Sequence, residues 1–179
     1  MKKKNGFTLI EIIVVVALII SATVILLTLS KNAGEATAVR SILSSALTEA
    51  TGTATGSGNG ATLVYIPPTA SLNGEIDLYK GQPNGGFIGL TPSKIYRIPG
   101  KLLTINGQNS VSTSNFAIFI NMYGRNTVGT WTPGSSTTTI PGCTPGAVSL
   151  SITYDGGSEV MNCGSGSFDS YDAHGTKII

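Results

Sequence analysis

The chain has 179 residues, of which only 11% are charged, and its formal net charge is +2. That length is sufficient for one domain and a membrane anchor. Three of its 11 basic residues are lysines at positions 2–4, which leaves eight basic residues against nine acidic ones in the rest of the chain. The positive charge therefore belongs to the N-terminus and does not indicate a nucleic-acid-binding surface.

A long apolar segment follows the lysines. Ile12 to Leu29 is apolar except for three hydroxyl residues, Ser21, Thr23 and Thr28. As a helix this segment is about 27 Å long, close to the roughly 30 Å hydrocarbon core of a bilayer. The lysines predict that the N-terminus stays cytoplasmic and that the rest of the chain lies across the membrane.

One carboxylate, Glu11, stands at the start of this segment, where a charge is costly and calls for a partner. A secretory signal peptide is one interpretation, with Ser21-Ala22-Thr23 as a small-residue cleavage site, but the apolar run continues to Leu29. A plain membrane anchor is another. It explains the length of the run but neither Glu11 nor the Gly6-Phe7 junction that precedes it.

The stretch Gly6-Phe7-Thr8-Leu9-Ile10-Glu11, between a lysine-rich leader and the apolar run, resembles the class III signal of bacterial type IV pilins. It also resembles the related pseudopilins of type II secretion. The resemblance covers about residues 1–50. It implies that a membrane prepilin peptidase cuts between Gly6 and Phe7 and that the new amino group of Phe7 is N-methylated. The apolar segment then anchors the subunit in the inner membrane and later becomes the core of a helical filament.

Phe7 and Glu11 are the residues that we expect to direct assembly. No lysine or arginine occurs between Phe7 and Ser30, so the nearest cation to Glu11 is the amino group created by cleavage. An ionised carboxylate in an apolar helix bundle costs several kcal/mol unless it is paired. The partner is the amine of the same helix or that of a neighbouring subunit, and the sequence leaves both pairings open.

The helix is expected to continue past the membrane segment to about Ala50. An apolar face recurs with helical spacing, made of Val39, Ile42, Leu43, Ala46, Leu47 and Ala50. Polar residues occupy the other side, and glycines from Gly52 onwards end the helix. The second half of the helix is therefore amphipathic, and a C-terminal part of the chain must cover its apolar face.

Short strands are predicted beyond the helix. The candidates are Ala61 to Ile66, Glu75 to Tyr79, Ile95 to Ile98, Lys101 to Ile105, Asn115 to Tyr123, Ala147 to Tyr154 and Ser158 to Cys163. Gly81 to Gly89 and Val128 to Gly142 are predicted to be loops because they are rich in glycine, proline, serine and threonine. The tail from Gly164 has no clear pattern.

Cys143 and Cys163 are the two cysteines of the chain, and both follow the membrane segment. On the outside of the cell they meet an oxidising compartment, so we expect one disulfide between them rather than two free buried thiols. With Gly156 at the centre of the turn Asp155-Gly156-Gly157, Cys163 is expected opposite about Ser149 and not opposite Cys143. The spacing of the cysteines resembles the C-terminal disulfide region of pilins, more weakly than the N-terminal motif does.

No catalytic constellation and no cofactor motif is found, so we expect a non-enzymatic protein. His174 is a lone histidine in a polar tail. A metal site is not expected. The resemblance to pseudopilins nevertheless bears on it, because major pseudopilins carry a calcium site in their C-terminal region. The acidic pairs Glu75 with Asp77 and Asp169 with Asp172 are the candidates for such a site. The basic residues beyond the leader form no run, and nucleic-acid binding is unsupported.

The sequence thus predicts an α+β, pilin-like fold, with a long N-terminal helix packed on a small antiparallel sheet. The expected divisions are a cleaved leader at 1–6, the helix at 7–54 and a head at 55–179. The expected function is that of a structural type IV pilus subunit, which polymerises with itself through inner-membrane assembly machinery into an extracellular filament. Adhesion, twitching motility, DNA uptake and conjugation are all open as uses of that filament. The alternatives are a secretion pseudopilin and, less favoured, a membrane-anchored binding module.

Overall fold

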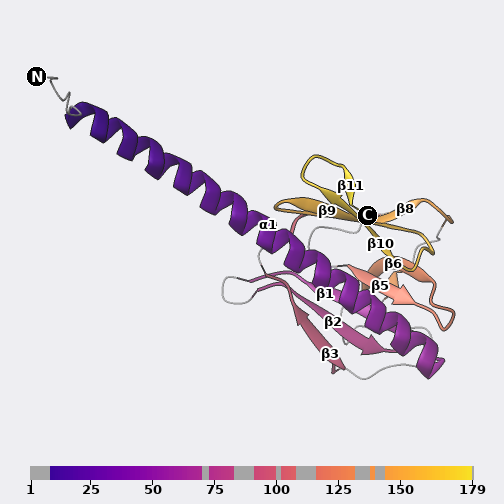
Figure 1. The fold of residues 1–179 in the computed structure, drawn as a ribbon. Coiled ribbons are helices and arrows are strands. Elements are labelled where there is room, and N and C mark those ends of the chain that lie inside the picture. Colours follow the sequence, from indigo (N-terminus) through magenta and orange to yellow (C-terminus); the bar gives the residue numbers. More distant parts are fainter. Residues whose placement is uncertain are drawn as a thin grey trace, which may run out of the picture.

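A computed structural model describes residues 9–69, 73–82, 91–99, 102–107, 116–131, 138–139 and 144–178. Within these residues one long helix lies against two antiparallel sheets (Figure 1). The α+β fold predicted from the sequence is therefore confirmed.

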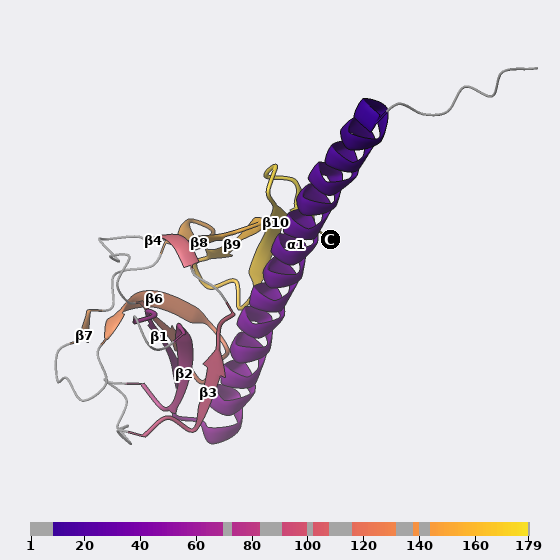
Figure 2. The ribbon, with the colours of Figure 1, turned by 90° about the vertical axis from the view of Figure 1, so that its left-hand side faces the viewer.

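The helix α1 runs from Leu9 to Ser57, farther than the expected end near Ala50. It contains no proline, and its 49 residues are about 74 Å long. Figures 1 and 2 show that its N-terminal half extends away from the sheets, whereas its C-terminal half lies along them. One continuous element thus has two different environments.

The first sheet has the strand order β3-β2-β1-β5-β6-β7. Its strands are β1 (Ala61–Ile66), β2 (Glu75–Lys80), β3 (Lys94–Arg97), β5 (Ala117–Ile120), β6 (Asn126–Trp131) and β7 (Thr138–Thr139). The second sheet has the order β11-β10-β9-β8-β4. Its strands are β4 (Leu102–Gly107), β8 (Val148–Tyr154), β9 (Gly157–Asn162), β10 (Phe168–Asp172) and β11 (Lys177–Ile178).

The core lies between the C-terminal half of α1 and the two sheets. Five of the six residues of the predicted apolar face are buried, namely Val39, Leu43, Ala46, Leu47 and Ala50, and Ile42 packs against them. They share one apolar cluster with residues of both sheets, among them Leu63, Ile118, Leu150, Ile152 and Met161. The sheets are therefore the cover that the amphipathic pattern required.

One loop assignment made from the sequence is wrong for its first residues. Val128 to Gly142 was expected to be a loop, but its first residues belong to β6, which pairs with β5 across a tight turn at 121–125. Thr127, Gly129 and Thr130 hide the strand pattern, although Val128 and Trp131 are buried. The tail after Gly164, which shows no pattern, forms the hairpin of β10 and β11.

The register expected for the C-terminal hairpin is also wrong. Tyr154 pairs with Gly157, which places Asp155 and Gly156 at the turn, and a bulge follows between Val148 and Leu150. As a result the backbone N–H of Cys163 donates to the carbonyl oxygen of Ala147 at 2.8 Å, and Cys163 does not lie opposite Ser149. The turn has two residues and is not centred on Gly156, which shifts the register by one residue. The extra residue of the bulge shifts every pair beyond it by one more.

A second, smaller apolar cluster lies on the face of the first sheet that is turned away from α1. Its buried members are Val64, Tyr79, Ala117, Phe119 and Trp131. The rings of Tyr79 and Trp131 pack edge to face, with their centroids 5.2 Å apart. The first sheet is therefore buried on both faces. The continuous apolar sequence of β5 is typical of a strand that is covered on both faces.

Asp77 is a buried carboxylate within this second layer, where only 4% of its surface is exposed. Its Oδ2 accepts a hydrogen bond from the hydroxyl of Tyr79 at 3.3 Å, whereas its Oδ1 is buried without a hydrogen-bond partner. Burial raises the pKa of Asp77, and the nearby charge of Glu75 raises it further. The folded state therefore holds a proton on Asp77 more tightly than the unfolded chain does.

Replacing Asp77 with Asn is predicted to stabilise the head at neutral pH by on the order of 1 kcal/mol, because an ionised and incompletely bonded carboxylate is removed. A raised pKa makes the carboxyl favourable at low pH and unfavourable as pH rises through it. The advantage of Asp77→Asn should therefore shrink as the pH falls through the mildly acidic range. Denaturant unfolding measured across that range tests this, with Asp155→Asn on the exposed β8–β9 turn as the control. Parallel stability curves for wild type and Asp77→Asn would contradict the assignment.

Candidate assembly helix and its attachment to the head

The N-terminal half of α1 is an exposed apolar surface. Leu9–Leu27 has a mean hydropathy of 3.0 with none of it buried, and it is the one described helix segment long and apolar enough to cross a membrane. Its large apolar side chains are between 48% and 77% exposed. An exposed apolar surface of this extent marks a site that contacts either another protein or a membrane. The length of the segment also fits the hydrocarbon core of a bilayer.

The hydroxyl groups of this segment bond within the helix. The Ser21 hydroxyl donates to the carbonyl oxygen of Ala17 at 2.8 Å, and the Thr23 hydroxyl donates to that of Ile19 at 2.8 Å. Because these donors are satisfied internally, the segment can enter lipid or pack against other helices without leaving a donor unpaired.

Glu11 lies in the first turn of α1, within the exposed segment. A carboxylate at this end interacts favourably with the helix dipole. Gly6 and Phe7 lie outside the described residues, so cleavage between them and N-methylation of Phe7 stay predictions. The same holds for the pairing of Glu11 with the amine of Phe7.

The C-terminal half of α1 is joined to the second sheet by a buried carboxylate. Glu159 of β9 is only 1% exposed, and its carboxylate accepts hydrogen bonds from Arg40 Nε at 3.2 Å, from the Tyr154 hydroxyl at 2.6 Å and from the Ser170 hydroxyl at 2.6 Å. Burial and the Glu159 carboxylate raise the pKa of Tyr154, which keeps its hydroxyl protonated as a donor. This cluster sets how the helix lies against β9 and β10.

A second attachment joins α1 to the edge strand β3. The carboxylate of Glu49 pairs with the ammonium group of Lys94 and accepts a hydrogen bond from the Tyr96 hydroxyl at 2.6 Å. The hydrogen bond from Lys94 is the main cause that lowers the pKa of Glu49, and the one from Tyr96 adds to it. Because this pair is exposed, it contributes less to stability than the buried Glu159 cluster.

The acidic residues considered as metal ligands have other roles. Asp77 is buried, Asp169 pairs with Lys177 at 2.8 Å, and Asp172 Oδ1 accepts the backbone N–H groups of His174 and Thr176. Over the described ranges no three His, Cys, Asp or Glu side chains are grouped so that they could hold a metal ion.

Cys163 is buried and is not a free thiol. Cys143 lies outside the described residues, so its pairing with Cys163 stays a prediction.

Comparison with known proteins bears on the N-terminus. A family model for the prokaryotic N-terminal methylation motif matches residues 1–28. The chain carries the class III signal of type IV pilins and pseudopilins. That motif belongs to a structural, non-enzymatic family, and it implies processing by a prepilin peptidase. Neither the curated proteins nor the solved structures contain a match to the chain.

The residues that attach the helix to the head were not found from the sequence. In the sequence pattern Arg40 and Glu49 lie on the polar side of the helix, and Glu159 lies in a predicted strand without any feature that sets it apart. The signal for Glu159 is the alternating pattern of β9. It places this glutamate at an inward position, between the buried Gly157 and Met161. A buried carboxylate at such a position requires a cationic partner.

Removing the cation of the Glu159 cluster is predicted to destabilise the head. In Arg40→Gln the buried carboxylate keeps only two hydroxyl donors, and since Arg40 is itself partly exposed we expect a loss of about 2–3 kcal/mol. Adding Glu159→Gln to this variant should recover part of the loss, because the two substitutions act on one pair. Denaturant unfolding of the detergent-solubilised chain measures both effects, with Arg97→Gln on β3 as the matched control. Additive losses in the double variant would mean that the two groups do not interact.

Proposed function

We propose that the protein is a structural subunit of a type IV pilus, polymerised through α1 into a helical surface filament. The observation that carries the proposal is the coincidence of two features. The methylation motif covers residues 1–28, and within it the helix segment Leu9–Leu27 is predominantly apolar and has none of its residues buried. A subunit that is first held in the inner membrane and then packed among copies of itself needs this surface in both states.

The two halves of α1 support this division of roles. The C-terminal half is fixed to the head by the apolar core and by Arg40 and Glu49, so the head travels with the helix as one body. Within the described residues, Leu9–Leu27 of the N-terminal half is not buried by the rest of the single subunit. Its cover must therefore come from lipid or from other subunits.

Glu11 is proposed to set the axial register of the filament. Apolar packing between helices is non-directional, so side chains such as those of Leu9–Leu27 fit at several axial offsets. A pair between this carboxylate and the amine of a neighbouring Phe7 forms at one offset only, and a charge–charge pair among apolar helices is worth enough to select that offset. Cleavage after Gly6 creates that amine, so processing and assembly are linked.

Sheared surface material from cells that express the protein tests the proposal as a whole. Long fibres that contain this chain, identified by mass spectrometry, are the expected result. A chain that is processed but stays with the cell envelope, without fibres, would instead indicate a secretion pseudopilin.

Processing is predicted to produce a mature chain that begins at N-methylated Phe7. The intact mass of membrane or filament material should equal that of residues 7–179 plus one methyl group, with a further adjustment of two hydrogens for a disulfide. Substituting Gly6 with Leu should leave the leader attached, since the peptidase needs the small residue. An intact Met1 in wild-type material, or cleavage near Thr23, would contradict the proposal.

Glu11→Val is predicted to be cleaved and inserted normally but to form no filaments, because the apolar faces remain and the charge that sets register is lost. Electron microscopy of sheared material and immunoblots of membrane fractions separate assembly from processing. Glu35→Gln, on the same helix but beyond the apolar segment, is the matched control and should assemble. Wild-type numbers of filaments from Glu11→Val would overturn the mechanism.

A further inference from the structure

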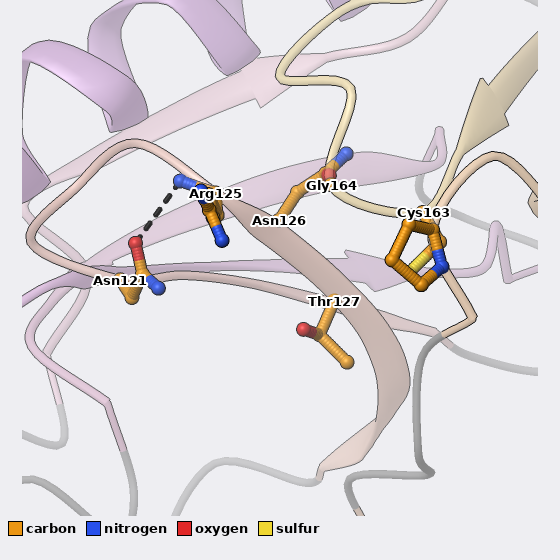
Figure 3. A pocket seen from close by; sticks show the side chains of 7 residues that line it. Asn121, Arg125, Asn126, Thr127, Cys163 and Gly164 are labelled. Atoms are coloured by element: carbon orange, nitrogen blue, oxygen red, sulfur yellow. Dashed lines mark hydrogen bonds between the residues drawn. The ribbon is translucent and has the colours of Figure 1, made fainter.

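An open pocket of about 520 Å³ lies on the head where the two sheets meet. The first sheet contributes Asn121, Arg125 and Thr127 from the β5–β6 hairpin, and the second contributes Pro145, Cys163 and Gly164 from the ends of β8 and β9. In Figure 3, Asn121 and Arg125 lie on one side of the pocket and Cys163 on the other, with Thr127 between them. The volume lies within the range of small-molecule sites, about 300–1,000 Å³.

The wall that carries Arg125 is held in place by its own turn. The Asn121 side-chain oxygen accepts the backbone N–H groups of Tyr123 at 2.9 Å and Arg125 at 3.0 Å, and the second of these bonds is drawn in Figure 3. Gly124, with a φ of +77°, turns the chain next to Thr51 of α1, whose methyl carbon lies 3.3 Å from the position of a Cβ at Gly124. The base of the Arg125 side chain is therefore fixed before any ligand binds.

The opposite wall is tied to the same strand. The N–H of Gly164 donates to the carbonyl oxygen of Asn126 at 3.3 Å, and the N–H of Cys163 donates to that of Ala147 at 2.8 Å. Cys163 is buried and not a free thiol. Both walls are thus joined at Asn126.

The described residues that line the pocket offer hydrogen-bond donors but no carboxylate. Among the residues that the structure describes, no carboxylate lies within ion-pair distance of Arg125, and its side chain is exposed. The Asn121 amide nitrogen and the Thr127 hydroxyl add neutral donors, and Pro145 offers an apolar surface. A guanidinium group recognises a carboxylate through two parallel hydrogen bonds. The ligand that fits combines one carboxylate with hydroxyl groups and an apolar face.

We propose that this pocket binds an acidic sugar unit, with Arg125 holding its carboxylate and Asn121 and Thr127 hydrogen-bonding its hydroxyl groups. A nucleic-acid backbone fits less well, because affinity for it grows with the number of phosphates neutralised, and Arg125 is the one cation among the described residues that line this pocket. The pocket lies on the head, away from the exposed Leu9–Leu27 segment, so binding there is independent of the proposed assembly surface.

Titration of the detergent-solubilised full chain with methyl β-D-glucuronide, followed by nuclear magnetic resonance, tests the proposal. Saturable binding in the millimolar range is expected, with methyl β-D-glucoside, the neutral counterpart, binding about tenfold more weakly or not at all. Arg125→Gln should lower affinity for the glucuronide about tenfold without changing the unfolding midpoint, whereas Arg97→Gln should leave affinity unchanged.

Three results would overturn the proposal. One is the absence of saturable glucuronide binding, and another is equal affinity of wild type and Arg125→Gln. The third is tighter binding of a short oligothymidylate that Arg125→Gln abolishes, since the pocket would then recognise phosphate. Because the assay needs no filaments, a failure of the pocket proposal is distinguishable from a failure of the pilus proposal.

Discussion

The structure depends on one constraint: α1 is longer than the head, so the head covers only the C-terminal half of the helix. Its C-terminal half finds an apolar cover within the chain, but Leu9–Leu27 does not. At about 25 cal/mol per Å² of apolar surface, an uncovered helix face of this length is untenable in water. The segment therefore needs a cover from lipid or from other chains, and this requirement links membrane anchoring to the proposed filament.

Two kinds of contact hold the C-terminal half of α1 against the head. Apolar packing of α1 on both sheets supplies most of the burial, and it tolerates small shifts along the helix axis. The Arg40–Glu159 and Glu49–Lys94 pairs remove that freedom, since each joins one position of the helix to one strand. Charge thus fixes geometry in the head, as the proposed pairing of Glu11 does between subunits.

Sequence patterns predicted those parts of the fold where a single period dominates. The helical spacing from Val39 to Ala50 identified the face that is buried, and the apolar run of β5 identified a strand covered on both sides. Prediction failed where the signal is not local. Threonines and glycines masked β6, and the bulge near Ser149 shifted the register of Cys163, because both depend on the partner strand rather than on the segment itself. The pocket beside Arg125 was likewise invisible, since its walls come from both sheets.

The position of the charges explains why one helix can serve in two environments. In the head half, Arg40 and Glu49 stand on the helix where the sheets supply partners of opposite sign. In the exposed half Glu11 is the one charged side chain among residues 9–27, and it lies in the first turn of α1. In the proposed subunit this place keeps the carboxylate near the membrane surface before assembly. A carboxylate several turns deeper would oppose insertion, and one absent altogether would leave packing without a register. The first turn is therefore the position at which a single carboxylate is compatible with lipid and can still select a neighbour.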